Sequence, residues 1–215
     1  TFVPPHKRDG SGFTRIYSPC AFVAMALILL AVAPAAAGAV TRFVFTNLRD
    51  GVGNTEIQVQ ELRLFGVDGA QLSILSISNP GGSSPGSQGP GNLVDGDIVS
   101  KQSKWLDFNM ACGAGNCTST LLVETTAETA SYELIKAHDA PKRDPSAWEV
   151  YRQGNDGGWA LAASEALGDS EMPCRTCWAA SYGVFDLSLS RTNASGVSTG
   201  TTRLDCRASA CSYAP

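Results

Sequence analysis

The sequence predicts an all-β fold, an antiparallel jelly-roll β-sandwich, preceded by one N-terminal transmembrane helix. Short segments rich in β-forming residues are separated by turn residues such as Gly, Pro, Asn and Asp. Beyond residue 40, the only stretch with a helical period is Trp159–Leu167, which is short. Because helices do not alternate with the strands, we expect antiparallel rather than parallel sheets.

The N-terminal helix is predicted from the segment 21–40, which reads AFVAMALILLAVAPAAAGAV and contains no charge. Its length matches the ~20 apolar residues that cross a bilayer. Lys7, Arg8 and Arg15 lie in the preceding tail, 1–20, and place that tail on the cytoplasmic, stromal or matrix side. Two alternatives remain open, a cleaved secretory or thylakoid-transfer signal and a buried helix. We expect a retained signal anchor, with the following domain on the trans side of the membrane.

The segments after the anchor define a β domain, 41–190, and a Cys-containing tail, 191–215. A slip in the alternation at Glu61–Leu62 predicts a bulge, and the low-complexity segment Asn79–Gly91 predicts a loop. The expected strands are 42–46, 57–65, 72–77, 121–125, 132–135, 148–151 and 184–189.

Composition and motifs argue against several functions. The net charge of −4 excludes nucleic-acid binding as a default, because phosphate binding requires a clustered basic face. Two histidines, His6 and His138, are too few for a histidine-rich metal site. The segment Gly196–Gly200 matches Gly-x-Ser-x-Gly, but no histidine follows it. We therefore expect no catalytic residues and no enzymatic activity.

The cysteines beyond the anchor come in three close pairs: Cys112 with Cys117, Cys174 with Cys177, and Cys206 with Cys211. An even number on the trans side predicts local disulfides in an oxidising compartment. Crossed pairing between the last two pairs is an alternative. A second alternative is a zinc site built from those four thiolates. A redox role of the Cys174-x-x-Cys177 motif is a third.

Several ordered motifs occur between residues 42 and 161. They comprise Trp105 and Asp107, then Asp139, Pro141, Arg143, Asp144 and Pro145, then Trp148, and finally Asn155, Asp156 and Gly157. In this combination the chain resembles the discoidin-like, coagulation-factor type C group of galactose-binding-like domains, in the form seen in algae and marine microbes. It departs from that form at His138, usually Asn, and at Gly154, usually Ser.

The resemblance implies an eight-stranded jelly roll that serves as a non-catalytic binding or docking module. Members of this fold often hold a structural calcium through backbone carbonyls and an acidic side chain. Asp95 and Asp97 are the nearest candidates for that role here. The resemblance also implies glycan binding through loops at one end of the fold, although no specific sugar contact transfers to this chain.

The motif residues also have physical roles that the sequence predicts directly. Pro141 and Pro145 bracket a rigid connection in which Arg143 and Asp144 pair or cap the backbone. Trp105, Trp148 and Trp159 are interpreted as core residues. Asn155–Gly158 suits a tight hairpin. For His138 we expect a structural hydrogen bond.

Together these features predict a single-pass, membrane-anchored accessory subunit without enzymatic activity. Its lumenal domain would dock on the protein subunits of a larger membrane complex, with a thylakoid photosystem supercomplex as the specific hypothesis. The first alternative is a surface or secretory lectin-like module that binds galactose-type glycans. The second is a zinc or redox role of the C-terminal cysteines.

Overall fold

The structure, a computed structural model, describes residues 38–51, 55–110, 118–187 and 203–204. These residues form β-strands and three short 3-10 helices, which confirms the predicted all-β class. The strands are β1 (Ala39–Leu48), β2 (Ile57–Val59), β3 (Glu61–Phe65), β4 (Ile74–Ser78), β5 (Trp105–Asp107), β6 (Ser119–Thr125), β7 (Ser131–Ile135), β8 (Pro145–Gln153), β9 (Trp159–Ala166), β10 (Ser181–Asp186) and β11 (Arg203–Leu204). The 3-10 helices are η1 (Pro90–Val94), η2 (Phe108–Met110) and η3 (Pro141–Arg143).

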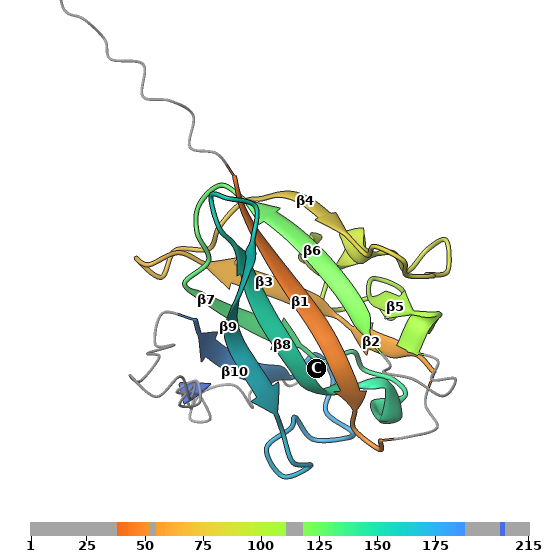
Figure 1. Cartoon of the computed structure of the whole chain (residues 1–215). Coiled ribbons are helices and arrows are strands. Elements are labelled where there is room, and N and C mark those ends of the chain that lie inside the picture. The colour runs from red at the N-terminus through yellow and green to blue at the C-terminus, as the bar shows by residue number, and fades with distance from the viewer. Residues whose placement is uncertain (1–37, 52–54, 111–117, 188–202, 205–215) are drawn as a thin grey trace, which may run out of the picture. The chain divides into compact units, whose positions relative to one another are not determined.

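The strands form three antiparallel sheets. A five-stranded sheet has the order β4-β6-β1-β8-β9, and a four-stranded sheet has the order β11-β10-β7-β3. Figure 1 shows the five-stranded sheet in front of β3, β7 and β10, so the two sheets are the layers of a sandwich. A small sheet of β2 and β5 lies at one side of them.

The centre of the five-stranded sheet is β1, which pairs with β6 on one side and β8 on the other. Its alternating pattern decides which face is buried. Phe43 and Phe45 are fully buried, whereas Arg42 and Val44 are half-buried on the outer face. Because the period of a strand is two residues, a shift of one position would expose both phenylalanines. This register therefore sets the position of the whole sheet against the core.

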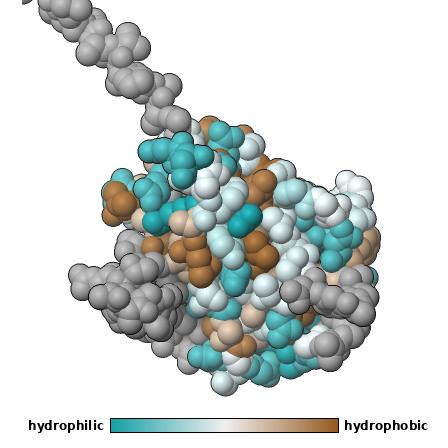
Figure 2. Space-filling view, in the orientation of Figure 1, coloured by the Kyte–Doolittle hydropathy of each residue, from teal (hydrophilic) through white to brown (hydrophobic). Residues whose placement is uncertain are grey.

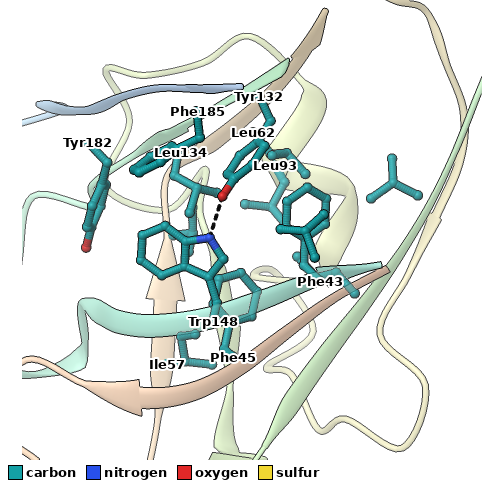
Figure 3. Close-up of a cluster of buried hydrophobic side chains, with 14 of the residues drawn as sticks. Phe43, Phe45, Ile57, Leu62, Leu93, Tyr132, Leu134, Trp148, Tyr182 and Phe185 are labelled. Carbon is teal, nitrogen blue, oxygen red and sulfur yellow. Dashed lines mark hydrogen bonds between the residues drawn. The ribbon is translucent and has the colours of Figure 1, made fainter. Parts of the chain in front are cut away.

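The core between the sheets is rich in aromatic side chains (Figure 3). Trp148 and Tyr132 come from opposite sheets, and the Trp148 Nε1–H donates to the Tyr132 hydroxyl over 2.7 Å. Edge-to-face and stacked contacts extend this pair, and Trp105 packs against it through Phe45. The large, fully buried aromatic residues are Trp105, Trp148, Tyr132, Tyr182, Phe43, Phe45 and Phe185.

Two segments differ from what their sequence patterns indicated. The segment 57–65 is divided at Gln60 into β2 and β3, one position before the predicted slip, and each strand pairs with a different partner. Trp159–Leu167, the stretch with a helical period, forms β9 instead. Its alanines favour a helix in isolation, but the hairpin pairs them with β8 along seven positions, so tertiary pairing decides the conformation.

The start of the sandwich also differs from the predicted boundary. Ala39 and Val40, the last two residues of the predicted anchor 21–40, belong to β1 and pair with Thr125 and Glu124 of β6. Residues 21–37 lie outside the described residues. Within the part of the chain that the structure describes, no helix is long and apolar enough to span a membrane.

The predicted C-terminal boundary changes in the same way. β10 ends at Asp186, and β11 lies within the segment 191–215 that we predicted as a tail. Its two residues pair with Val184 and Phe185 of β10. The tail therefore contributes a short edge strand to the four-stranded sheet.

Candidate functional site

Two loops, 95–104 and 136–144, are held together by buried glutamines. Gln58 Nε2 donates to the carbonyl oxygens of Asp139 and Ala140, the latter over 3.2 Å. Gln60 Nε2 donates to three carbonyl oxygens of the other loop, at Asp97 (2.9 Å), Ser100 (3.1 Å) and Ser103. Because both amides are fully buried, the positions of the two loops depend on β2 and the residue that follows it.

Lys104 joins these two loops directly. Its Nζ lies against Asp139 Oδ1 and donates to Gln58 Oε1 over 3.3 Å. The side chain of Lys104 is 3% exposed, whereas that of Asp139 is 46% exposed. The ion pair therefore connects the two loops close to the protein surface. We call the region formed by these two loops and by the segment 167–180 the loop end.

A buried cluster of three charges lies at the base of the loop end. Asp144 Oδ2 lies 3.1 Å from Arg49 Nη1 and 3.7 Å from Lys136 Nζ. All three side chains are at most 1% exposed. Breaking such a pair is strongly destabilising, because it leaves a buried charge without compensation. The cluster therefore fixes the ends of β1, β7 and β8 relative to one another.

Burial perturbs the titration of this cluster. It raises the pKa of Asp144 to about 7, although the positive charges of Lys136 and Arg49 act in the opposite direction. Burial also lowers the pKa of Lys136, against the effect of Asp144. Both shifts have the same physical cause, since removal from water disfavours the charged form of either group.

The segment 167–180 covers this cluster and contains the Cys174–Cys177 disulfide. Its backbone carbonyls accept from the buried cations: Pro173 O from Arg49 Nη2, and Cys177 O from Lys136 Nζ over 3.3 Å. The predicted local pairing is therefore confirmed for this pair, and crossed pairing with Cys206 or Cys211 is not what the structure shows. With the two sulfurs bonded to each other, neither is a thiolate that could bind zinc. Cys112, Cys117, Cys206 and Cys211 lie outside the described residues.

The exposed surface of the loop end carries an aromatic pair. Trp178, which follows the disulfide directly, is 52% exposed, and its ring centroid lies 5.3 Å from that of His138. The predicted hydrogen bond of His138 is wrong for the residues that the structure describes, because both ring nitrogens are buried without a partner among them. Burial lowers the pKa of His138, which disfavours the charged form of the ring that packs against the indole.

The two predicted calcium ligands lie in the loop that Gln60 holds. Asp95 Oδ1 accepts from the Asp97 backbone N–H over 2.8 Å, and Asp95 Oδ2 accepts from the Ser103 hydroxyl. Asp97 Oδ1 accepts two further backbone N–H groups, which lowers the Asp97 pKa. Both carboxylates therefore shape the loop through their own hydrogen bonds.

Glu61 adds a third carboxyl next to this loop. Its side chain is buried at the start of β3, and its Oε2 has no hydrogen-bond partner among the described residues. Burial, reinforced by Asp95 and Asp97, raises its pKa to about 7. No group of three or more His, Cys, Asp and Glu side chains within the described ranges has the arrangement of a metal centre.

The other motif residues lie in different parts of the fold. Trp105 and Trp148 are in the core, whereas Trp159 is half-buried on the outer face, where Arg42 lies 4.4 Å above its ring. That position differs from the core role we predicted for Trp159. Arg42 also lies 4.3 Å from the ring centre of Tyr151, so it is stacked between two aromatic rings.

Asp107 and the prolines have structural roles. The fully buried Asp107 accepts from Asn79 Nδ2 over 3.1 Å and from the Ser83 backbone N–H over 2.8 Å, and it thereby fixes the loop 79–83. Pro141 begins η3 and Pro145 begins β8, so the two prolines bracket the connection as predicted.

Arg143 and Asp144 do not pair with each other. Arg143 pairs with Glu56, and Asp144 pairs with Arg49 and Lys136. Arg143 is the last residue of the 3-10 helix η3, whereas Asp144 after it is extended and leads into β8.

The hairpin residues lie at the far end of the sandwich from the loop end. Residues 154–158 join β8 to β9, and Gly154 N–H donates to Gly158 O over 2.8 Å. Asp156 Oδ1 accepts from the Gly158 backbone N–H, and Gly157 has a φ of +79°. Asn155, Asp156 and Gly157 therefore form the expected turn but are not part of the loop end.

Sequence reasoning missed the residues that assemble the loop end: Arg49, Gln58, Gln60, Glu61, Lys104, Lys136 and Trp178. Gln58 and Gln60 alternate with apolar residues, a pattern that indicates a solvated face. The structure buries both faces of this segment. A usable signal was the position of Lys136 directly after the predicted strand 132–135, and of Lys104 directly before Trp105, a predicted core residue. An unpaired charge at such a position would be destabilising.

Comparisons with known proteins give no match. No family model matches the chain, and none of the curated proteins or solved structures matches it. The resemblance to discoidin-like domains therefore stays a prediction.

Proposed function

We propose that the sandwich is a discoidin-like jelly roll that acts as a non-enzymatic docking module. In this proposal it is held at a membrane by the segment before β1 and binds protein subunits of a larger membrane complex. A thylakoid photosystem supercomplex is the specific partner that we propose, on the basis of the signal-like segment and the algal character of the motifs.

The observation that carries the proposal is an exposed aromatic residue on a rigid support. Trp178 is half-exposed, although its own loop is held by a disulfide and by carbonyl contacts to two buried cations. Exposed tryptophans on rigid supports are typical of the residues that dominate protein interfaces. The surrounding charges are paired with each other, as for Arg175, which lies 2.7 Å from Asp50 and 3.1 Å from Asp169.

The outer face of the five-stranded sheet is a second exposed region. The outer face of the five-stranded sheet carries separate hydrophobic patches between hydrophilic ones (Figure 2). Leu161 of β9 is 49% exposed and Leu75 of β4 is 55% exposed. Scattered patches of this size are compatible with a water-facing module, so we assign the primary contact to the loop end.

The test uses the tagged full chain, expressed in the cells that naturally produce it, so that the native membranes and their complexes are present. After mild detergent extraction, the wild-type chain should migrate with a large complex on native gels. The Trp178→Ala chain should migrate as a free protein, whereas the matched control Leu161→Ala, on the other exposed region, should keep the wild-type pattern. Migration of the wild-type chain as a free monomer would refute the docking proposal.

A second candidate function is glycan binding, favoured by the Trp178–His138 pair. An indole beside a second ring offers a flat apolar surface of the kind that contacts the C–H face of a sugar. Retention of the domain on a glycan array, lost in Trp178→Ala, would favour this function. Co-migration with a membrane complex that soluble galactose does not displace would favour docking instead.

The calcium ion that the resemblance implies does not fit the loop 95–104 as it is folded. The three carbonyl oxygens that converge there accept from the Gln60 amide, a hydrogen-bond donor that occupies the place of a cation. The Asp95 and Asp97 carboxylates accept from N–H and hydroxyl groups of the loop itself, and among the described residues they are not part of a metal centre.

A further inference from the structure

The Cys174–Cys177 disulfide lies in the covering segment between two backbone contacts to buried cations. Pro173 O, just before it, accepts from Arg49, and Cys177 O, at its end, accepts from Lys136 Nζ over 3.3 Å. Ala180 O, further along, accepts from the Lys136 backbone N–H over 2.9 Å. The disulfide therefore joins Cys177, whose carbonyl contacts Lys136, to the residue directly after Pro173, whose carbonyl contacts Arg49.

We propose that this disulfide is a reversible redox latch on the loop end, opened by a dithiol reductant of the protein class. When it is closed, Trp178 is held against His138 and the covering segment lies over the charge cluster. When it is opened, the segment 173–178 separates from Arg49 and Lys136, and Trp178 leaves His138. The effect on partner binding rests on the proposed docking function, whereas the opening of the loop does not.

The position of the bond allows a reductant to reach it. Cys174 is exposed and Cys177 is half-buried. The two residues between them are exposed as well, so within the described residues the Cys174 end of the motif faces solvent. Accessible disulfides are the ones that thiol exchange selects.

The short loop makes the bond a local element. The two cysteines are three positions apart, and closing so short a loop stabilises a fold less than closing a long one. The main core cluster comes from the sheets and includes Met172, before the motif, but no residue of the segment 174–178. Opening the bond should therefore loosen the segment while the sandwich stays folded.

The exchange balances with a dithiol as the electron donor. One reductant thiolate attacks the exposed Cys174 sulfur, the Cys174–Cys177 bond breaks, and the Cys177 sulfur leaves as a thiolate that takes a proton. The second reductant thiol then forms the reductant's own disulfide and releases Cys174. In total, two electrons and two protons pass from the dithiol to this protein.

The experiment measures the bond and the loop together in the full chain. The wild-type chain is titrated with a dithiol protein such as a reduced thioredoxin, alkylated, and mapped by peptide mass, while amide hydrogen exchange is followed in 168–180. We expect exchange in this segment to accelerate at least tenfold as Cys174 and Cys177 become alkylated. Exchange in β1 should stay unchanged.

Two double variants separate this bond from the other cysteines. Cys174→Ser/Cys177→Ser should show the fast exchange with and without reductant. The matched control Cys112→Ser/Cys117→Ser should respond like the wild-type chain, and if it fails to fold, the peptide map of the wild-type chain still assigns the response. Alkylation of Cys174 and Cys177 with exchange unchanged within twofold would overturn the latch.

Co-migration with the membrane complex gives the second readout. Loss of co-migration on reduction, together with its loss in Trp178→Ala, supports control of docking by the latch. If Trp178→Ala co-migrates normally while reduction accelerates exchange, the docking role of Trp178 is refuted and the latch stands. If Trp178→Ala alone loses co-migration, the docking surface stands and control by reduction is refuted.

Discussion

Protonation of Glu61 is expected to contribute, as does that of Asp144, to how the stability of the sandwich depends on pH. The side chain is 3% exposed, and Oε2 has no partner among the described residues. Burial raises its pKa from 4.5 to about 7, Asp95 and Asp97 act in the same direction, and Arg63 opposes them. Replacing Glu61 with Gln keeps the shape of the neutral side chain and removes its titration.

The sign of the effect follows from proton binding. Between pH 4.5 and 7 the folded protein keeps a proton on Glu61 that the unfolded chain releases, so the free energy of unfolding falls as the pH rises through this range. Each pKa unit corresponds to 1.36 kcal/mol, which gives a loss of ~3 kcal/mol for the wild-type chain. The Glu61→Gln chain retains that stability because it has no proton to lose.

Urea-induced unfolding between pH 4 and pH 8, in the presence of a chelator, measures the difference between the two chains. The free energy of unfolding of Glu61→Gln should gain ~3 kcal/mol on that of the wild-type chain across this interval. Glu128→Gln, which removes a carboxylate that is 68% exposed, is the matched control. Parallel profiles for the wild-type and Glu61→Gln chains would show that Glu61 ionises without penalty and would refute the reasoning.

Three further substitutions test the core, the charge cluster and the hairpin through the free energy of unfolding. Tyr132→Phe leaves the fully buried Trp148 N–H without its acceptor and should lower it by about 1–3 kcal/mol; a loss below about 0.5 kcal/mol would contradict the role of this bond. Arg49→Met removes one of the two cations beside Asp144 and should lower the free energy of unfolding by about 3–5 kcal/mol. The double variant Arg49→Met/Asp144→Asn should regain part of that loss, because it also removes the buried negative charge. Gly157→Ala forces a left-handed φ of +79° on alanine and should lower the free energy of unfolding by about 1–2 kcal/mol. An unchanged urea midpoint of unfolding would contradict this expectation.

Much of the fold was predictable because it depends on local patterns. The β-forming residues of the segment 42–46 predicted a strand, and β1 contains that segment. Trp148 was predicted in the core because it is a large apolar side chain, and it is fully buried. The Asn-Asp-Gly-Gly turn predicted the β8–β9 hairpin, because a left-handed position requires glycine there.

Less of the candidate site was predictable. Asp139, Arg143 and Asp144 were predicted to lie in one rigid connection, but their partners Lys104, Glu56 and Arg49 are more than thirty positions away in the sequence. No local pattern encodes such pairs. Trp178 had no motif to distinguish it, and its exposure depends on the fold of the covering segment.

The sequence by itself determined the β class, most strand positions, the hairpin turn and the close spacing of Cys174 and Cys177. These properties depend on residues within a few positions of one another. Only the tertiary structure decided that Gln58 and Gln60 are buried, that residues 159–166 form a strand, and that Glu61 lies beside Asp95 and Asp97. The physical reason is that burial and charge pairing depend on segments brought together by the two sheets, and their energies exceed local propensities of a few tenths of a kcal/mol per residue.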